Sequence, residues 1–408
     1  MKSHTLWTRN YTTITIGTII SAIGGVGLNF ALTVLIYNET SSTLLSAIFS
    51  AVIMIPNIVL PLMIGPYIDK FSRKNIIVIS DMCMAALFLA VAYFTRDGYF
   101  SYIPFMLLGV LISTNGVIYG IAYESLFPEL IPEGMLQKGY SISSLIYPTV
   151  NTLVLPVAAI IFDRYGVSAI FLIEGVLLSI ASLFEMRIRV DESQVKIHKD
   201  NPQSFIVMVK EGISYLKEER GIWAIFVFFF FLLMAGEGVN VLLYPFFENH
   251  PVWTVTQYAL LISFATGGRL FGGVMHYFIK IPSHVRFNIA AFVYFSLSII
   301  NGVLLFLGYP MMIVAQVLVG LLSINSFNIR MSSVQSYVPS AKRGRVNGIY
   351  HIMTALGSII GRLLAGTLGE FFPFAWIALF MSMGGMVAFF MIIIKNRESV
   401  KLVYNRTI

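Results

Sequence analysis

Apolar residues gather along this chain in stretches that are long enough to cross a lipid bilayer as helices. A spanning helix needs about 20 predominantly apolar residues, because each residue advances the helix by only about 1.5 Å. Twelve stretches satisfy this rule, and short polar or charged connections separate most of them. The pattern therefore predicts an all-α polytopic membrane protein. The predicted helices cover residues 12–37, 42–65, 75–94, 101–127, 138–162, 167–187, 221–247, 254–280, 287–307, 310–335, 345–369 and 373–394.

One long polar segment separates the first six predicted helices from the last six. Inside it, the sequence "FIVMVKEGISYLKEE" places apolar residues at helical spacing beside charges, which is typical of an amphipathic helix on a membrane surface. Pro132 and Pro339 follow the fourth and the tenth helix at corresponding places, as a duplicated six-helix unit predicts. We expect an N-terminal bundle at 1–187, a cytoplasmic linker with an amphipathic helix at 188–220, a C-terminal bundle at 221–394 and a cytoplasmic tail at 395–408.

The composition agrees with a membrane protein and excludes a soluble domain. Hydrophobic residues make up 57% of the chain and charged residues only 12%, with a mean hydropathy of +0.81. In a typical soluble domain about a quarter of the residues are charged. A fold that faces water could not bury as much apolar surface as this chain carries. The aromatic run "FVFFFF" at residues 226–231 is interpreted as a face toward lipid.

The basic residues are distributed asymmetrically about the predicted helices. Of the 27 Lys and Arg residues, 22 lie at the termini or in loops on the same side as the termini. Only Arg96 and Arg164 lie in loops on the other side, and Arg269, Arg330 and Arg362 lie within helices. Cytoplasmic loops are the ones enriched in Lys and Arg, so both termini are predicted to be cytoplasmic. The net charge of +7 is then a topology signal, and we expect no nucleic-acid partner.

The stretch "GPYIDKFSRK", residues 65–74, places four charged side chains between two apolar runs. It resembles the signature between helices 2 and 3 of the major facilitator superfamily. Two further stretches, "LFPELIPEGML" and "SYVPSAKRGRVNG", are similar to the macrolide-efflux and siderophore-exporter branch of that family. The resemblance covers essentially the whole chain, and it implies two six-helix pseudo-repeats that transport by alternating access. The signature matches at Gly65, Asp69, Lys70, Arg73 and Lys74, with Ser72 where a second Gly usually stands.

The resemblance implies that the signature is a conformational latch on the cytoplasmic side. Gly65 lets one helix approach another closely. Asp69 could accept a hydrogen bond from Arg73 and face the positive N-terminal end of the predicted helix 345–369. In the alternative interpretation the three cations of the signature are only anchors on the positive side of the membrane. An anchor needs no carboxylate, so Asp69 is the residue that favours a latch.

The resemblance also implies that helices 1, 4, 7 and 10 line a central cavity. Polar groups on such helices would be costly against lipid, so they are candidates for binding substrate or protons. The candidates are Asn29, Asn115, Tyr119, Tyr123, Glu124, Glu237, Asn240, Tyr244, Asn328 and Arg330.

Glu237 is the most deeply placed carboxylate among these helices. It could carry a proton or bind a cation, but it could equally form a structural ion pair or a helix cap within "AGEGVN". Arg269 and Arg362 are interpreted as partners in structural pairs, and Glu174 could pair with a neighbouring helix. The predicted helix 101–127 lacks the Arg that exporters of this family commonly carry there, which departs from the usual proton-antiport arrangement.

The resemblance implies a secondary active transporter that exports a small hydrophobic or amphiphilic compound of drug, macrolide or siderophore type, driven by a proton gradient. Import of a nutrient or organic anion is the alternative, and a membrane sensor or lipid-acting enzyme is a remote one. The chain contains no Gly-Lys pair, no His-Glu-x-x-His and no Gly-x-Ser-x-Gly. We therefore expect no enzyme, cofactor or metal. The expected partners are a small-molecule substrate, a proton or other coupling ion and the bilayer of the plasma membrane, with the chain a multi-pass monomer.

Overall fold

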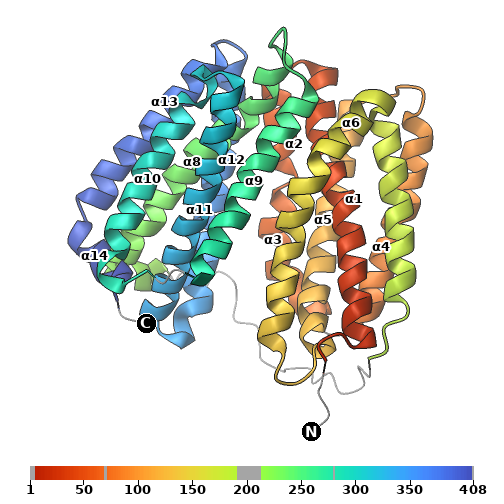
Figure 1. Ribbon diagram of the computed structural model, residues 1–408, viewed down its shortest axis with the longest axis horizontal. Coiled ribbons are helices and arrows are strands. Elements are labelled where there is room, and N and C mark those ends of the chain that lie inside the picture. The colour runs from red at the N-terminus through yellow and green to blue at the C-terminus, as the bar shows by residue number, and fades with distance from the viewer. Residues whose placement is uncertain (1–4, 69–70, 191–212, 279–280, 407–408) are drawn as a thin grey trace. The chain divides into compact units, whose positions relative to one another are not determined.

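The computed structural model describes residues 5–68, 71–190, 213–278 and 281–406 (Figure 1). Every regular element within those ranges is a helix, and 11 of the helical segments there are long and apolar enough to cross a membrane. One of the 11 contains two helices that meet at a sharp turn, so the predicted count of twelve and the all-α fold class are confirmed. The helices fall into two compact units.

Unit 1 is built around one long helical segment. Its described residues lie within 1–40, 52–200 and 255–263. α6 is central, because both α1 and α4 pack along it, while α5 packs against α3 and α4. The elements are α1 (Arg9–Thr40), α3 (Ile55–Ile68), α4 (Arg73–Thr95), α5 (Tyr102–Leu126), the 3₁₀ turn η1 (Phe127–Leu130), α6 (Leu136–Glu185) and the first part of α9 (Val255–Phe278).

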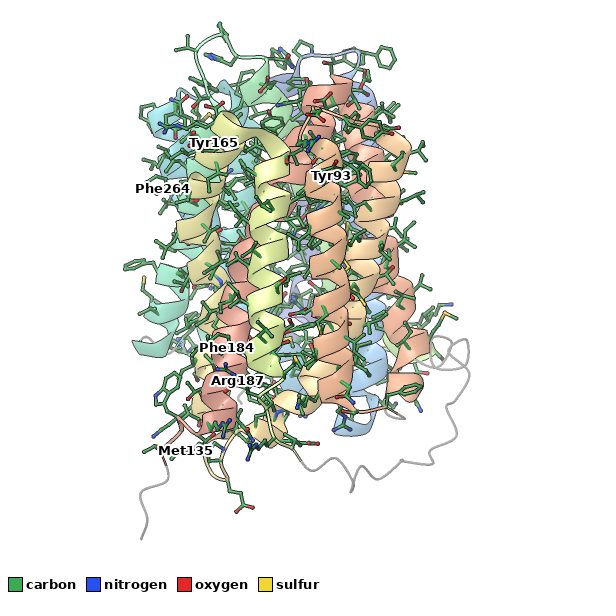
Figure 2. All side chains as sticks on the ribbon, turned by 90° about the vertical axis from the view of Figure 1, so that its right-hand side faces the viewer. Tyr93, Met135, Tyr165, Phe184, Arg187 and Phe264 are labelled. Atoms are coloured by element: carbon green, nitrogen blue, oxygen red, sulfur yellow. The ribbon has the colours of Figure 1, made fainter. Side chains whose placement is uncertain are left out.

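α6 spans 50 residues but reverses direction at a glycine. Gly166 has φ +71°, a left-handed conformation that only glycine adopts at little cost. In Figure 1 the two arms of α6 meet near its label, and in Figure 2 Tyr165 lies at that end while Phe184 and Arg187 lie at the other. The two arms correspond to the predicted helices at 138–162 and 167–187.

The second predicted helix, 42–65, is interrupted. The structure forms α2 (Thr43–Val52), a two-residue turn, and α3. Pro56 lies in the first turn of α3. Because proline has no N–H, one carbonyl group of the preceding turn lacks its helical hydrogen-bond donor. The hydroxyl of Ser113 on α5 donates to the carbonyl oxygen of Ile53 at 2.6 Å, which satisfies a backbone group exposed by the break.

Unit 2 contains the remaining helices. Its described residues lie within 41–51, 201–254 and 264–408. α8 is the central helix, because α12 and α13 both pack along it. The elements are α2, α8 (Arg220–Glu248), the rest of α9, the 3₁₀ turn η3 (Ser283–Val285), α10 (Arg286–Val303), the 3₁₀ turn η4 (Leu304–Phe306), α11 (Tyr309–Tyr337), α12 (Ser340–Gly369), α13 (Phe374–Ala388), the π-helical turn η5 (Phe389–Ile394) and α14 (Arg397–Tyr404).

Two glycines bring α8 and α12 into close contact. A Cβ atom on Gly357 would collide with the carbonyl oxygen of Phe230, and one on Gly361 with that of Met234. Glycines four residues apart let two helix backbones approach in this way. The contact fixes the register of α8 against α12. It thereby positions the side chains further along both helices.

Half of the aromatic run on α8 is buried within the protein, so its interpretation as a lipid-facing surface is wrong for those residues. Phe226, Phe228 and Phe229 are at most 6% exposed. The ring of Phe228 lies 4.8 Å from that of Tyr294, and the ring of Phe226 lies 5.1 Å from that of Tyr350. A buried helix in a bundle is apolar all round, so hydrophobicity alone could not separate a lipid face from this core.

The segment predicted as a tail contains a helix that packs on unit 2. α14 buries Val400, Val403 and Tyr404. The hydroxyl of Tyr404 lies 2.6 Å from that of Tyr294 on α10, and the hydroxyl of Ser333 on α11 donates to the Tyr404 carbonyl at 3.2 Å. Burial and the neighbouring Tyr294 raise the pKa of Tyr404 well above its ordinary value, so this contact stays neutral at physiological pH.

Glu370, at the end of α12, caps the beginning of α2. Its carboxylate accepts hydrogen bonds from the Leu44 N–H and the Ser42 hydroxyl, both at 2.8 Å, and from the Thr43 hydroxyl at 3.0 Å. Burial alone would raise the pKa of Glu370, but these hydrogen bonds outweigh it and hold the pKa below its ordinary value. The ionised carboxylate therefore stabilises the folded state at neutral pH, and this contribution is lost as pH falls through the lowered pKa.

Most of the predicted amphipathic helix lies outside the described residues, which resume at residue 213. Residues 213–218 are helical. Leu216 is fully buried there in the hydrophobic core of unit 2, beside residues of α8 and α14.

Candidate functional site

Unit 1 contains a cavity of about 410 Å³ between α1, the first arm of α6 and the start of α9. That volume is within the range of small-molecule sites, roughly 300–1,000 Å³. The lining combines amide and hydroxyl groups with aromatic and aliphatic side chains. It consists of Ser21, Gly25, Val26, Asn29, Phe30, Thr33, Tyr147, Asn151, Leu155, Tyr258 and Ile262.

The two amide side chains of the cavity are held by their own helices. The Asn29 amide donates to the Gly25 carbonyl at 2.8 Å, and the Asn151 amide donates to the Tyr147 carbonyl at 3.0 Å. An amide has two N–H donors and a carbonyl oxygen, so each keeps further hydrogen-bonding capacity for a ligand. The rings of Phe30 and Tyr258 stack with centroids 5.9 Å apart and form an aromatic wall. The cavity therefore suits a ligand with an apolar body and a few polar groups.

Of the predicted candidates on α1 and α5, the structure places Asn29 in the lining of this cavity, together with Thr33 of α1. On α5, the hydroxyl of Tyr119 donates to Glu185, and the ring of Tyr123 stacks between those of Tyr119 and Phe127. Asn115 is half-buried and Glu124 is exposed on the same helix. Neither of these two lines the cavity.

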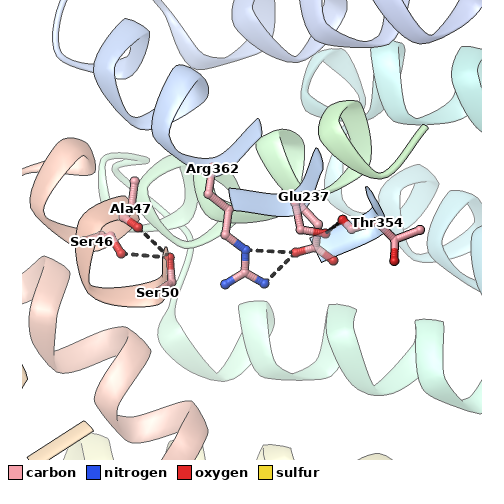
Figure 3. Close-up of polar contacts among 7 residues, drawn as sticks. Ser46, Ala47, Ser50, Glu237, Thr354 and Arg362 are labelled. Atoms are coloured by element: carbon pink, nitrogen blue, oxygen red, sulfur yellow. Dashed lines mark hydrogen bonds and ion pairs between the residues drawn. The ribbon is translucent and has the colours of Figure 1, made fainter. Parts of the chain in front are cut away.

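Glu237 on α8 forms an ion pair with Arg362 on α12 (Figure 3). One carboxylate oxygen accepts two hydrogen bonds from the guanidinium, at 2.6 Å from Nη2 and 3.1 Å from Nε. The two side chains are 26% and 22% exposed. This arrangement favours the structural interpretation of Glu237 over a free proton carrier, and it agrees with the interpretation of Arg362 as a pairing residue.

Arg330 on α11 is 7% exposed and lies among aromatic rings. Its guanidinium carbon is 4.0 Å from the ring centroid of Tyr350, 5.0 Å from that of Phe229 and 5.5 Å from that of Phe327. Its Nε has no hydrogen-bond partner among the described residues. Cation–π attraction stabilises the charge in this environment.

The other candidates of unit 2 are not gathered around one site. The Tyr244 hydroxyl donates to Glu248 one turn further along α8 at 2.9 Å, and the Tyr244 side chain is buried. Asn240 is exposed, and Asn328 is half-buried on α11.

The signature is only partly within the described residues. Asp69 and Lys70 lie outside them, while Gly65 belongs to the last turn of α3 and Lys74 to the first turn of α4. Ser72, which replaces the usual second Gly, caps α4 by accepting from the Asn75 N–H at 3.2 Å.

Arg73 of the signature pairs with an acid of η1. Its guanidinium donates to the Glu129 carboxylate at 2.7 Å and to the Ser125 carbonyl at 3.4 Å. The Arg73 side chain is 14% exposed, so the pair ties the start of α4 to the end of α5.

Two buried acids, Asp81 on α4 and Glu185 on α6, were not predicted from the sequence, and Glu174 was given only a pairing role. Asp81 and Glu174 are 4% exposed, and Glu185 is fully buried. The signal was present, because any ionisable residue within a spanning helix is a functional candidate. These residues lie on α4 and α6, which are not among the helices that the resemblance assigns to the cavity.

Comparison with known proteins agrees with this architecture. Macrolide efflux protein A of Streptococcus pyogenes is 23% identical over 383 residues, which cover 91% of this chain and 92% of that protein. Macrolide efflux protein A of Enterococcus faecalis is 24% identical over 311 residues, covering 73% of this chain and 93% of that protein.

Solved transporters share the fold. The nucleoside transporter NupG is 16% identical and superposes with a TM-score of 0.69, covering 95% of this chain and 99% of that one. A bacterial homologue of the iron transporter ferroportin in an inward-facing state is 15% identical with a TM-score of 0.68, covering 94% of this chain and 98% of that one.

The family itself follows from the sequence model of the Major Facilitator Superfamily, which matches residues 14–307 and 285–404. The resemblance inferred from the signature is thereby confirmed, together with a multi-pass membrane transporter for a small molecule and the exclusion of an enzyme. The chain belongs to the Major Facilitator Superfamily.

Proposed function

We propose that this transporter exports a small amphiphilic compound from the cytoplasm by alternating access, using the proton gradient. The observation that supports it most is the cavity of about 410 Å³, in which amides and hydroxyls stand among aromatic and aliphatic side chains. Such a lining accommodates an apolar body and offers it a few hydrogen bonds. The relatives named macrolide efflux proteins support export of a compound of this kind.

The orientation and assembly are part of the same proposal. The chain lies in the cell membrane with both termini in the cytoplasm, because 22 of its 27 basic residues fall on that side. It works as a monomer, since each chain supplies both six-helix repeats of the fold. The signature around Asp69 controls opening toward the cytoplasm.

Export is tested by accumulation in bacterial cells that express the chain. A fluorescent amphiphile and a radiolabelled macrolide should accumulate less in these cells than in cells with an empty vector. Asn151→Leu should restore accumulation toward the empty-vector level, because each lost ligand hydrogen bond costs about 1 kcal/mol, or roughly five-fold in affinity.

Gln137→Leu is the matched control, because Gln137 is exposed on the first turn of the same helix and away from the cavity. It should leave accumulation at the level of the unaltered transporter. Equal effects of the two substitutions, at equal protein levels, would show that the cavity does not bind the exported compound.

Arg330 favours a second candidate, transport of an organic anion. It is a buried cation held by aromatic rings, and an anion could replace those weak contacts by charge-assisted hydrogen bonds. A radiolabelled aromatic carboxylate in the same cells separates the two candidates. Accumulation of the carboxylate above the empty-vector level, with unchanged levels of both amphiphiles, would favour import of an anion over export.

A further inference from the structure

Unit 1 encloses three carboxyl groups that the candidate cavity does not itself contain. Asp81 belongs to α4, and Glu174 and Glu185 belong to the second arm of α6. The most exposed of the three side chains is 4% accessible. We call these three groups the carboxyl row.

The carboxyl row follows one face of α1 over successive turns. Glu185 lies against Gly17, where an added Cβ would be 3.2 Å from a carboxylate oxygen. Glu174 lies against Gly24, where an added Cβ would collide with a carboxylate oxygen. Between them, the Ser21 hydroxyl donates to Asp81 at 3.4 Å. Positions 17, 21 and 24 share one face of a helix, so α1 makes room for the acids with glycine and contacts the middle one with serine.

The row contains no compensating cation. Within the described part of the chain, no Lys, Arg or His pairs with any of the three carboxyl groups; the titratable groups that face them are Tyr119, Tyr123 and Tyr147. Tyr119 donates to one oxygen of Glu185 at 3.0 Å. The other oxygen of Glu185 and one oxygen of Glu174 are buried without any hydrogen-bond partner among the described residues.

Buried carboxyl groups in this situation are stabilised by protons. An unpaired carboxylate is far more costly to bury than a neutral carboxylic acid, so such a group takes up a proton instead of remaining charged. Asp81 and Glu185 lie against neighbouring turns of α1, at Ser21 and Gly17. Two carboxyl groups can share a hydrogen bond only when at least one of them is protonated. Protons are therefore the ligands that the unsatisfied carboxyl oxygens would bind.

The row also touches the cavity. Ser21, which donates to Asp81, is a lining residue, and so is Gly25, whose Cβ position is 4.0 Å from a carboxylate oxygen of Glu174. Tyr147 lines the cavity as well and lies close enough to Glu174 and Asp81 to interact with their charge. A change of charge in the carboxyl row therefore changes the electrostatic potential at the cavity wall.

We propose that the carboxyl row is the proton-binding site of this transporter, coupled to the cavity through Ser21 and Gly25. The proposal rests on the proposed proton-driven export and names the groups that perform it. Binding a proton forms one O–H bond on a carboxylate and removes one negative charge, and release to water reverses both changes. The row would therefore load and release protons as the neighbouring cavity binds and releases its substrate.

Infrared spectroscopy of the purified protein tests proton binding without any substrate. The carbonyl stretch of protonated carboxyl groups is followed while pH is raised from neutral to alkaline. The unaltered protein should show this band at neutral pH and lose it on titration. Glu185→Gln and Asp81→Asn should each remove part of the band, because an amide does not titrate. Glu133→Gln, an exposed acid of the loop after η1, should leave it unchanged.

Transport measurements separate the two proposals. If the variants lose the band and also lose gradient-driven transport while they still exchange substrate at equal pH on both sides, the row is the coupling site. A missing band in the unaltered protein, or a band that persists in Glu185→Gln, Asp81→Asn and Glu174→Gln, would overturn the proposal. A band that behaves as expected in a protein that moves no amphiphile would refute the export function and leave the proton site standing.

If Glu185→Gln does not fold, Glu174→Gln and the titration of the unaltered protein still decide the question. Glu174 and Glu185 lie on different turns of α6. Replacing Glu174 therefore leaves the hydrogen bond from Tyr119 to Glu185 intact. Loss of the corresponding part of the band in this variant supports the proposal, and an unchanged band contradicts it.

Discussion

Glu237→Gln is expected to lower the melting temperature of the purified transporter markedly and to leave the pH dependence of transport unchanged in the protein that folds. The substitution removes the charge that accepts both hydrogen bonds from Arg362 and leaves the guanidinium without its counter-ion. Breaking a buried pair in this way costs on the order of 3 kcal/mol, at the lower end for such pairs because both side chains keep about a quarter of their exposure.

The double variant Glu237→Gln, Arg362→Gln is the control for this prediction. It removes both charges, so most of the lost stability should return. Asp97→Asn, which breaks a pair whose carboxylate side chain is 80% exposed, should change the melting temperature little. A well-folded Glu237→Gln protein with a flattened pH profile would instead show that Glu237 carries the proton.

Asp69→Asn is expected to abolish most transport while the protein still inserts and folds. The substitution keeps the size of the side chain and removes the one acidic charge of the signature, which the proposed latch requires. The measurement is substrate flux per inserted molecule, with the melting temperature on the same preparation.

The control for Asp69 is again Asp97→Asn, which removes one acid from an exposed loop position. Its flux should match that of the unaltered transporter. Flux near the unaltered level in Asp69→Asn as well would mean that the signature only anchors the loop through its cations.

The number of helices and most of their ranges could be predicted from the sequence, because spanning helices must satisfy their backbone within a fixed apolar length. The interruption at Pro56 and the burial of Phe228 could not be predicted in the same way. Hydropathy does not distinguish a lipid-facing helix surface from one buried in the protein. A proline can either kink a helix or end it. The docking of α14 depends on contacts such as Tyr294 with Tyr404, which are 110 residues apart in sequence.

The candidate site was predictable only in part. Asn29 was identified because an amide within the first spanning helix would be costly against lipid and so belongs in the protein interior or a cavity. The sequence does not indicate Asn151 and Tyr147 as lining residues, because the resemblance places the cavity on four helices and α6 is not among them. The partner of Glu237 could not be inferred, since three intramembrane arginines were available and only the packing of α8 on α12 selects Arg362.

The central claim, proton-driven export, is tested most directly by flux into inverted membrane vesicles, whose outer surface is the cytoplasmic face. With an acidic vesicle interior, a radiolabelled macrolide or a fluorescent amphiphile should accumulate inside, and a protonophore should abolish the accumulation. Vesicles without the transporter supply the background. Accumulation that is the same with and without the pH gradient, or that occurs only in right-side-out vesicles, would contradict proton-driven export.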